Sequence, residues 1–428
     1  MATVVLVGTL DTKGEEYAWL RERLREYGSD VLLVDVGVLP PPAHGPAADV
    51  PAEAVARAAG HDLAELRASG DRGAAVVAMA DGLTAVVLDL HREGTLHAVL
   101  AAAGSGGSAI AAQAMRALPI GVPKVLVSTM AGGDVAPYVD SSDLTMMYSV
   151  VDISGINSVS RHILGNAAAA AAGMARRQER NLEELAGPRR KVVAATMFGV
   201  TTPAVDAARA RLAELGYEVL VFHATGAGGR AVEKLAADGL LDGVLDLTTT
   251  ELADELVGGV LSAGPDRLTA AGAAAIPQVV APGALDMVNF GPAASIPERF
   301  AGRRFLVHNP TVTLMRTTTE EMTALGALLG HKLAAARGPA ELFWPLRGLS
   351  AVDVEGAPFA DPAADTAGLD ALRSTVRGSG VHLHEVDAHI NDAVFAVAMA
   401  DRLHRLIGER AASPAARRPT PTPSRSTP

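Results

Sequence analysis

Four glycine-rich turns contain the residues of this chain best suited to holding an anion. Each follows an apolar run and precedes a helical pattern; the segments are VVLVGTLDTKG (4–14), HAVLAAAGSGGSAIAAQAM (97–115), PKVLVSTMAGGDVAP (123–137) and LVFHATGAGGRAVEKL (220–235). A parallel strand that leads through a glycine turn into a helix presents unpaired backbone N–H groups at the carboxyl edge of its sheet. This pattern predicts a protein that binds a nucleotide or a phosphate.

The first turn, GTLDTKG (8–14), combines hydrogen-bond donors with a cation. The groups expected to contact phosphate oxygens are those of Gly8, Thr9, Thr12 and Lys13. Asp11 is a candidate for holding Mg²⁺ or for capping the helix. The alternative is a helix cap without a ligand, with Asp11 or Thr12 as N-cap and Glu15 completing a capping box. The turn is not a P-loop, because the chain has no GxxxxGK[ST].

The second and third turns are predicted to line one cleft, because neighbouring parallel strands end at the same edge of a sheet. AAGSGGSA (102–109) contributes the candidates Gly104, Ser105, Gly106, Gly107 and Ser108. STMAGGDVAPY (128–138) contributes Ser128, Thr129, Met130, Ala131, Gly132 and Gly133. The alternative is a tight strand-to-helix turn without a ligand. The strict dinucleotide spacing GxGxxG is absent, which disfavours NAD.

Carboxylates near these turns are candidates for further contacts. Asp134 is a candidate Mg²⁺ ligand, as are Asp140 and Asp143 nearby, although charged loop residues are more often simply solvated. Asp35 closes the strand VLLVDVG, where an acidic residue can accept hydrogen bonds from ribose hydroxyls. An ordinary loop carboxylate is the alternative at that position.

Two segments of the second half are candidates for catalysis: GALDMVNFGP (283–292) and VHNPTVTLMRTTTEEM (307–322). His308 and Asn309 leave a predicted strand, and Arg316 precedes a run of threonines. Polar groups with a guanidinium at a strand end suit an anionic substrate such as a carboxylate. The alternative is a His–Asn turn network, with Arg316 in an inter-domain ion pair.

Composition limits the possible classes of protein. A chain of 428 residues is long enough for two α/β domains and a tail. Its net charge of −11 argues against a nucleic-acid partner. With no cysteine it has no disulfide, zinc-thiolate or thiol chemistry. Met1 leads directly into a strand without a basic leader, and no apolar run is long enough for a membrane span, so we expect a soluble, cytoplasmic protein without a membrane partner.

The fold class predicted is α/β, with two Rossmann-like subdomains built on parallel sheets. The expected domains are 1–180, which holds the nucleotide, and 191–410; a disordered tail is expected at 411–428 and a hinge at 176–191. Expected strands lie at 3–7, 31–36, 97–101, 123–128, 242–246, 277–280, 304–307, 341–343 and 381–384. The segment 191–226 repeats the order seen in residues 3–36: an apolar run, a small-residue turn, a helix, a glycine and a second apolar run. TAVVLDLHREG (84–94) fits either a strand or a continuing helix, and the helix is favoured.

Several long motifs resemble one known family. They are GTLDTKGEE, AAGSGGSA, VSTMAGGDVAPYV, DISGINSVSR, GALDMVNFG, HNPTVTLMRTT, WPLRGLS and HINDAVF. They resemble the Tm-type ATP-binding family, uncharacterised proteins named after a plant resistance protein against a tobamovirus. The resemblance covers about residues 3–409. It implies two Rossmann-like subdomains, a homodimer, and ATP contacts within Gly8–Lys13, Gly104–Ser108 and Ser128–Gly133, but it supplies no reaction.

The function expected is ATP binding, with Mg²⁺, by the N-terminal domain of an enzyme that acts on a small anionic substrate at an inter-domain cleft. The first alternative is a nucleotide-dependent protein-interaction module without catalysis. The second is a hydrolase or lyase that binds a phosphorylated substrate instead of ATP. Release of ADP or AMP would favour the enzyme, and stoichiometric retention of ATP would favour the module.

Overall fold

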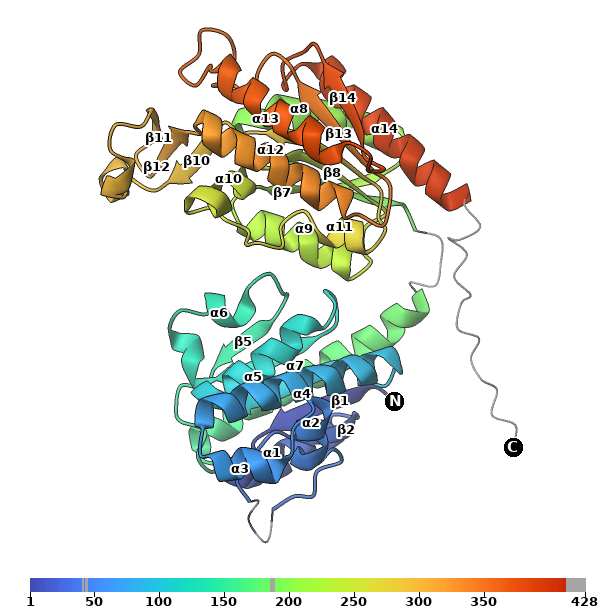
Figure 1. Cartoon of the computed structure of the whole chain (residues 1–428). Helices are drawn as coiled ribbons and strands as arrows, with labels where there is room; N and C mark the ends of the chain where they lie inside the picture. Colours follow the sequence, from blue (N-terminus) through green and yellow to red (C-terminus); the bar gives the residue numbers. More distant parts are fainter. Residues whose placement is uncertain (41, 43–44, 185–188, 413–428) are drawn as a thin grey trace. The chain divides into compact units, whose positions relative to one another are not determined.

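The computed structural model describes residues 1–40, 42, 45–184 and 189–412. The chain divides into two compact units, Met1–Arg189 and Arg190–Pro428, each built around a parallel sheet (Figure 1). The α/β fold class predicted from the sequence is therefore confirmed. The last helix continues to Ala412, and the rest of the predicted tail lies outside the described residues.

Unit 1 contains a five-stranded parallel sheet in the order β2-β1-β3-β4-β5. Its strands are β1 (Thr3–Gly8), β2 (Asp30–Asp35), β3 (Ala98–Ala103), β4 (Lys124–Ser128) and β5 (Thr145–Tyr148). Its helices are α1 (Leu10–Glu26), α2 (Ala52–Ala58), α3 (Leu63–Ser69), α4 (Arg72–Arg92), α5 (Ser105–Ala117), α6 (Ala136–Val139) and α7 (Ser158–Glu184). The helices cover both faces of the sheet, which is why the strands read as continuous apolar runs.

Alternation along β1 shows how the two faces are covered. Val4 and Leu6 pack with α1 and α7, whereas Val5 and Val7 pack with α2, α4 and α5. Successive side chains of a strand point to opposite faces, so one run of valine and leucine supplies both cores. The carboxyl ends of β1, β2 and β3 lie side by side in this sheet, and their loops are thereby brought together.

Unit 2 contains a six-stranded parallel sheet in the order β14-β13-β9-β8-β6-β7. Its strands are β6 (Val192–Met197), β7 (Glu218–His223), β8 (Gly243–Thr248), β9 (Gln278–Gly283), β13 (Ala340–Pro345) and β14 (His382–Val386). Its helices are α8 (Thr202–Glu214), α9 (Ala227–Ala237), α10 (Thr250–Val257), α11 (Ala270–Ala273), α12 (Thr319–Ala334), α13 (Pro362–Val376) and α14 (Ala393–Ala412). Helices α8 and α14 cover one face, and the core on the other face is shared by α10, α12 and α13.

A small antiparallel sheet is inserted between β9 and α12 and was not predicted. Its order is β10-β12-β11, with β10 (Met287–Phe290), β11 (Phe305–Asn309) and β12 (Val312–Arg316). A strand was expected at 304–307, where β11 lies, but β10 and β12 were not. The two segments of the second half named as candidates for catalysis, 283–292 and 307–322, thus contain strands of this insertion.

Other boundaries also differ from expectation. The segment 84–94 is helical to Arg92, as favoured, because α4 runs without a break from Arg72. The predicted hinge at 176–191 is wrong for residues 176–184, which continue α7. Strand β5 was missed, since its four residues, TMMY, are too short to show a period against their polar neighbours.

Helix α4 is long and apolar enough to cross a membrane by length and composition. Its residues Met79, Leu83 and Val87 are buried in the core of unit 1, and it packs against α5 and α2. A central helix of an α/β unit meets the same composition test as a membrane span. The apolar composition of α4 is therefore explained by its packing in the core of unit 1.

Candidate functional site

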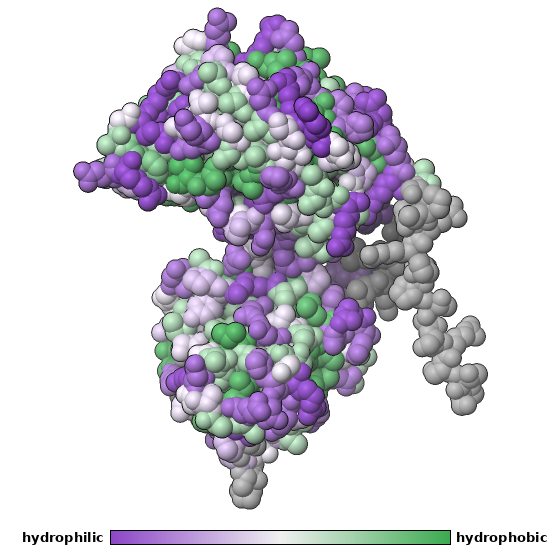
Figure 2. Space-filling model, viewed as in Figure 1, coloured by the Kyte–Doolittle hydropathy of each residue, from purple (hydrophilic) through white to green (hydrophobic). Residues whose placement is uncertain are grey.

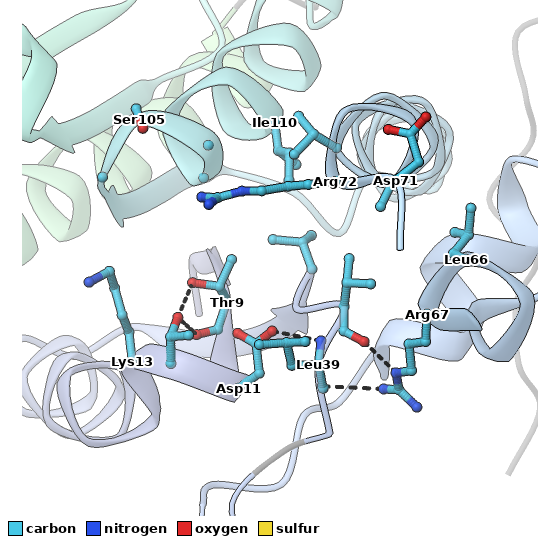
Figure 3. Close-up of a pocket in the computed structure, with 18 of the residues that line it drawn as sticks. Thr9, Asp11, Lys13, Leu39, Leu66, Arg67, Asp71, Arg72, Ser105 and Ile110 are labelled. Carbon is cyan, nitrogen blue, oxygen red and sulfur yellow. Dashed lines mark hydrogen bonds between the residues drawn. The ribbon is translucent and has the colours of Figure 1, made fainter. Parts of the chain in front are cut away.

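A cavity of about 570 Å³ opens at the carboxyl edge of the unit 1 sheet (Figure 3). It is bounded by the loops that follow β1, β2 and β3 and by the junction of α3 and α4. The lining residues are Thr9, Asp11, Thr12, Lys13, Val36, Val38, Leu39, Leu66, Arg67, Gly70, Asp71, Arg72, Ala75, Val76, Gly104, Ser105, Gly106, Gly107 and Ile110. The first and second glycine turns singled out in the sequence thus share one cavity of a size typical for small ligands.

One end of the cavity is formed by the N-terminus of α5. Gly104 is the N-cap, and no side chain caps the helix there. The first intrahelical hydrogen bond runs from the amide of Ser108 to the carbonyl of Gly104, 2.8 Å away. The amides of the first helical residues have no carbonyl partner one turn earlier, and the helix dipole adds positive potential. This end, which we call the anion end, is suited to a phosphate.

At the anion end, glycine is needed for its lack of a side chain and not for a left-handed backbone conformation. Gly104, Gly106 and Gly107 all have negative φ. A Cβ on Gly106 would meet no atom nearer than the Arg72 guanidinium at 3.8 Å, so it would point into open space. The lack of a side chain leaves the backbone accessible to a ligand, which is the use of glycine that the sequence analysis proposed.

The β1–α1 turn forms the floor beside the anion end. The hydroxyl oxygens of Thr9 and Thr12 lie 3.1 Å apart, and Lys13 sits at a kink in α1 with non-helical backbone angles. The Lys13 amine donates a hydrogen bond to the Ile153 carbonyl. The alternative cap assignment was wrong: Thr9 is the N-cap and makes no side-chain capping bond, while Asp11 accepts a hydrogen bond from the Leu39 amide at 2.9 Å.

Two arginines line the cavity that the sequence analysis did not identify. Arg72 is the first residue of α4 and reaches across to the N-terminus of α5, as Figure 3 shows. Arg67, on α3, donates hydrogen bonds to the carbonyls of Val38 and Leu39. Both lie between the strands expected at 31–36 and 97–101, in a segment for which no ligand contact was predicted. Nothing in its pattern indicated which strand ends it would face.

The other end of the cavity, which we call the apolar end, is lined by aliphatic side chains. They come from the loop after β2 and from α3 and α4: Val38, Leu39, Leu66 and Val76. Ile110 of α5 also lines the cavity, and Figure 3 shows it beside Arg72. Leu39 is 59% exposed, so a large apolar side chain faces solvent at the mouth of the cavity. An apolar ligand group placed here would remove that surface from water.

Four residues predicted to contact a nucleotide have structural roles instead. Gly8 is required by packing, because a Cβ there would lie 2.0 Å from the Tyr17 ring. The Asp35 carboxylate accepts hydrogen bonds from the amides of Leu10 and Gly37 at 3.0 and 2.8 Å, so it organises the loops. Ser108 and Ser128 are fully buried, and their hydroxyl oxygens lie 2.7 Å apart. These residues position the cavity without lining it.

The third glycine turn does not line the cavity, which corrects the expectation of one cleft shared by turns two and three. Thr129, Met130, Ala131 and Gly132 form a short 3-10 helix that Ser128 caps through the Met130 amide, and Gly133 ends it. Nearby, the Asp134 carboxylate accepts a hydrogen bond from the Ala136 amide at 3.0 Å. No cluster of three acidic or histidine side chains fit for a metal occurs in the described part of the chain.

In unit 2 the candidate catalytic residues are not brought together. Asn309 pairs with Val312 at the turn of the β11–β12 hairpin, whereas the Arg316 amide bonds to the Arg304 carbonyl at the opposite end. His308 and Asn309 are exposed, and Asn309 accepts hydrogen bonds from Thr311. Because each residue of a strand advances about 3.3 Å, Arg316 is more than ~10 Å from His308 along the hairpin.

Arg316 is buried within an acidic cluster of unit 2. Its guanidinium donates to Asp365 at 2.6 Å, to Asp353 at 3.4 Å and to the Phe359 carbonyl at 2.7 Å. Asp286 lies beside them and accepts a hydrogen bond from the Ser350 hydroxyl at 2.7 Å. The expected role of Arg316 in holding a substrate carboxylate is therefore corrected: protein carboxylates occupy the guanidinium. The alternative of an ion pair was right in kind, but the pairing lies within unit 2.

This cluster should make unit 2 more stable as the pH falls from 8 to 5. Burial raises the pKa of Asp353 and of Asp365 to about 7, and that of Asp286 to about 6, despite the nearby guanidinium. At a pH between the ordinary carboxyl pKa near 4 and these raised values, the folded chain binds protons that the unfolded chain does not. The free energy of unfolding therefore decreases as the pH rises through this interval. We expect a gain of at least about 2 kcal/mol over this range, because each unit by which one pKa is raised corresponds to about 1.4 kcal/mol.

Urea unfolding at pH 8, 6.5 and 5 measures this effect. Trp344 is buried in the core of unit 2 and reports on it alone in a Trp19→Phe background. Asp353→Asn mimics the protonated form and should flatten the pH dependence, whereas the exposed control Asp370→Asn should not. Equal pH dependence in both variants would show that the cluster does not titrate in this range.

Comparison with known proteins shows the family. The model for the N-terminal domain of an uncharacterised protein family, UPF0261, matches residues 2–180, and the model for its C-terminal domain matches residues 190–407. The chain belongs to the UPF0261 family. A UPF0261 protein of Clostridium tetani is 49% identical over 94% of this chain and 98% of its own length. A UPF0261 protein of Rhizobium meliloti is 47% identical over 93% of this chain and 97% of its own length.

A plant relative carries the most descriptive name. The ToMV resistance protein Tm-1(GCR237) of Solanum lycopersicum is 41% identical over 93% of this chain but only 55% of its own length. Among solved structures, a UDP-N-acetylglucosamine 2-epimerase from Rickettsia bellii aligns over 96% of both chains at 10% identity, with a TM-score of 0.24. A likeness this low supports no argument about function.

Proposed function

We propose that unit 1 of this UPF0261 protein binds ATP. The observation that supports this most directly is that one cavity joins the amides of α5 and the Arg72 guanidinium to an aliphatic wall. Triphosphate suits the first part, because amides at a helix N-terminus and a guanidinium both favour an anion. The adenine ring suits the second, where it would cover Leu39 and its neighbours. The resemblance to Tm-type ATP-binding proteins points to the same ligand.

Mg²⁺ would accompany the phosphates in this proposal. The ion is commonly held by one or two carboxylates together with phosphate oxygens and water, so a site without a preformed cluster suits it. Asp11 is the candidate, since its carboxylate lines the cavity beside Thr9 and Thr12. Asp134 is a poorer candidate, because it lies on the third turn, outside the cavity.

Calorimetry with ATP and Mg²⁺ on the whole chain tests the proposal. One molar equivalent of ATP bound per chain is expected. Absence of binding to a folded protein would overturn it. Incubating the complex and separating ATP, ADP and AMP then distinguishes turnover from retention. Assembly as a homodimer remains a prediction, to be measured by sedimentation of the same samples.

A protein-interaction module that depends on ATP is the second candidate function. It gains support from unit 2, where His308 and Asn309 lie at one end of a hairpin and Arg316 is engaged by carboxylates at the other. An enzyme acting on a small anionic substrate would need other residues than these three. Stoichiometric retention of unhydrolysed ATP favours the module, and product release favours the enzyme.

Lys13→Ala should weaken ATP more than adenosine. Lys13 lines the cavity, and of the two ligands only ATP offers its ammonium a negative charge. We expect about a tenfold loss for ATP, roughly 1.4 kcal/mol, and less than about a twofold loss for adenosine. Calorimetry with both ligands measures the difference. Equal losses for both ligands would instead assign Lys13 to holding Ile153 in place.

A further inference from the structure

Arg72 differs from the other cations that line the cavity. The Lys13 amine donates to the Ile153 carbonyl, and the Arg67 guanidinium donates to the carbonyls of Val38 and Leu39. No hydrogen bond or ion pair of the Arg72 guanidinium occurs among the described residues. One of its terminal nitrogens would lie 3.8 Å from a Cβ added at Gly106, in the first turn of α5. The exposed Arg72 guanidinium therefore adds to the positive potential at a helix N-terminus, and both favour an anion.

Several polar backbone groups of the loop after β2, at the opposite end of the cavity, already have hydrogen-bond partners. The Leu39 amide donates to Asp11 at 2.9 Å, and the Gly37 amide donates to Asp35 at 2.8 Å. The carbonyls of Val38 and Leu39 accept hydrogen bonds from Arg67. The rest of the wall comes from α3, α4 and the turn between them, Gly70 and Asp71. Backbone groups inside the helices are paired along the helix.

Two charged side chains near the apolar end make hydrogen bonds to the protein. One oxygen of the Asp71 carboxylate accepts a hydrogen bond from the Ala74 amide at 3.0 Å and so caps α4. Figure 3 shows Arg67 turned toward the Leu39 loop, in line with its hydrogen bonds to that loop. A base placed against Leu39 and Leu66 would therefore meet mainly methyl groups. A pocket that makes no hydrogen bonds to a group rejects its analogues only weakly, whereas one built on such bonds rejects them strongly.

We infer that the cavity selects its ligand by phosphate charge, read by Arg72, and accepts purine nucleoside triphosphates without discriminating between their bases. This inference rests on the proposed nucleotide site of unit 1 and names the ligand class of that site. Selectivity lies at the anion end, and the apolar end contributes affinity through burial alone. ATP and GTP are then equivalent ligands, and adenosine is a poor one.

Calorimetry on the whole chain with ATP, GTP and adenosine tests this inference. ATP and GTP should bind within about fivefold of each other. Arg72→Ala should weaken both by at least about tenfold while changing adenosine by less than about twofold. Arg72→Lys, which keeps the charge but not the planar fork, should recover part of the loss. Leu39→Ala should weaken all three ligands by a similar factor.

Arg92→Ala is the matched control, because it removes the same charge from the exposed last turn of the same helix. It should leave all three affinities unchanged. GTP binding about 100-fold weaker than ATP would overturn the inference by showing that the base is read. So would a folded Arg72→Ala protein with unchanged affinity for ATP. If the unmodified chain binds neither ATP nor GTP, the proposed function itself fails.

Discussion

Arg316→Ala is expected to destabilise unit 2 by about 3–5 kcal/mol, because it leaves buried carboxylates without their cation. Asp353 and Asp365 both contact the guanidinium, and Asp286 lies beside it, fully buried. Removing one partner of a buried ion pair costs far more than the pair contributes, since the remaining charge keeps its desolvation penalty. Part of the loss should be recovered at pH 5, where the raised pKa values of the aspartates allow them to be neutral.

Urea unfolding followed by Trp344 fluorescence measures the loss. Arg304→Ala is the control, because Arg304 is half exposed and pairs with Asp361 at 3.6 Å; it should cost less than about 1 kcal/mol. Arg316→Lys should also destabilise, since an ammonium cannot reproduce the bonds to Asp365 and the Phe359 carbonyl at once. An Arg316→Lys protein that is as stable as the unmodified chain and binds ATP, but no longer turns it over, would support the substrate-binding role of Arg316 instead.

Local sequence was sufficient to predict the strand-to-helix turns of unit 1. Residues 8–14 and 102–109 were identified as turns because an apolar run, a glycine and a helical period follow one another within a few residues. The choice of ligand-facing residues within each turn was less successful. Gly8 resembles a phosphate-binding glycine in sequence, but its lack of a side chain leaves room for the ring of Tyr17, nine positions later. Ser108 looked accessible, but its hydroxyl is buried against Ser128.

Residues that depend on long-range packing were beyond the reach of the sequence. Arg72 enters the cavity because α4 packs on α5 and α2, which places its first residue above the start of α5. In the sequence, Arg316 precedes a run of threonines, and it was therefore interpreted as a polar residue at a strand end that could hold a substrate. The acidic partners that bury it come from positions 353 and 365, on segments with no detectable pattern linking them to it. Charge complementarity of this kind appears only when the chain is folded.

Gly106→Val should lower the affinity for ATP by at least about tenfold, or 1.4 kcal/mol, while unit 1 stays folded. The added Cβ would meet no atom nearer than Arg72 at 3.8 Å, so the methyl groups enter the cavity and not the core. Gly106 has negative φ, so the substitution brings no left-handed backbone strain that would confuse the result. The amides of α5 remain in place but are covered, and the phosphates lose close approach to them.

The neighbouring glycines show why Gly106 is the informative position. A Cβ at Gly107 would lie 2.9 Å from the Ala103 side chain, so a substitution there disturbs packing as well as binding. Gly173→Val is the matched control, because Gly173 is a helical glycine of unit 1 at which an added Cβ would have no atom within 4 Å. It should retain full affinity in calorimetry. A folded Gly106→Val protein that binds ATP as tightly as the Gly173→Val control would place the phosphates elsewhere than at the N-terminus of α5.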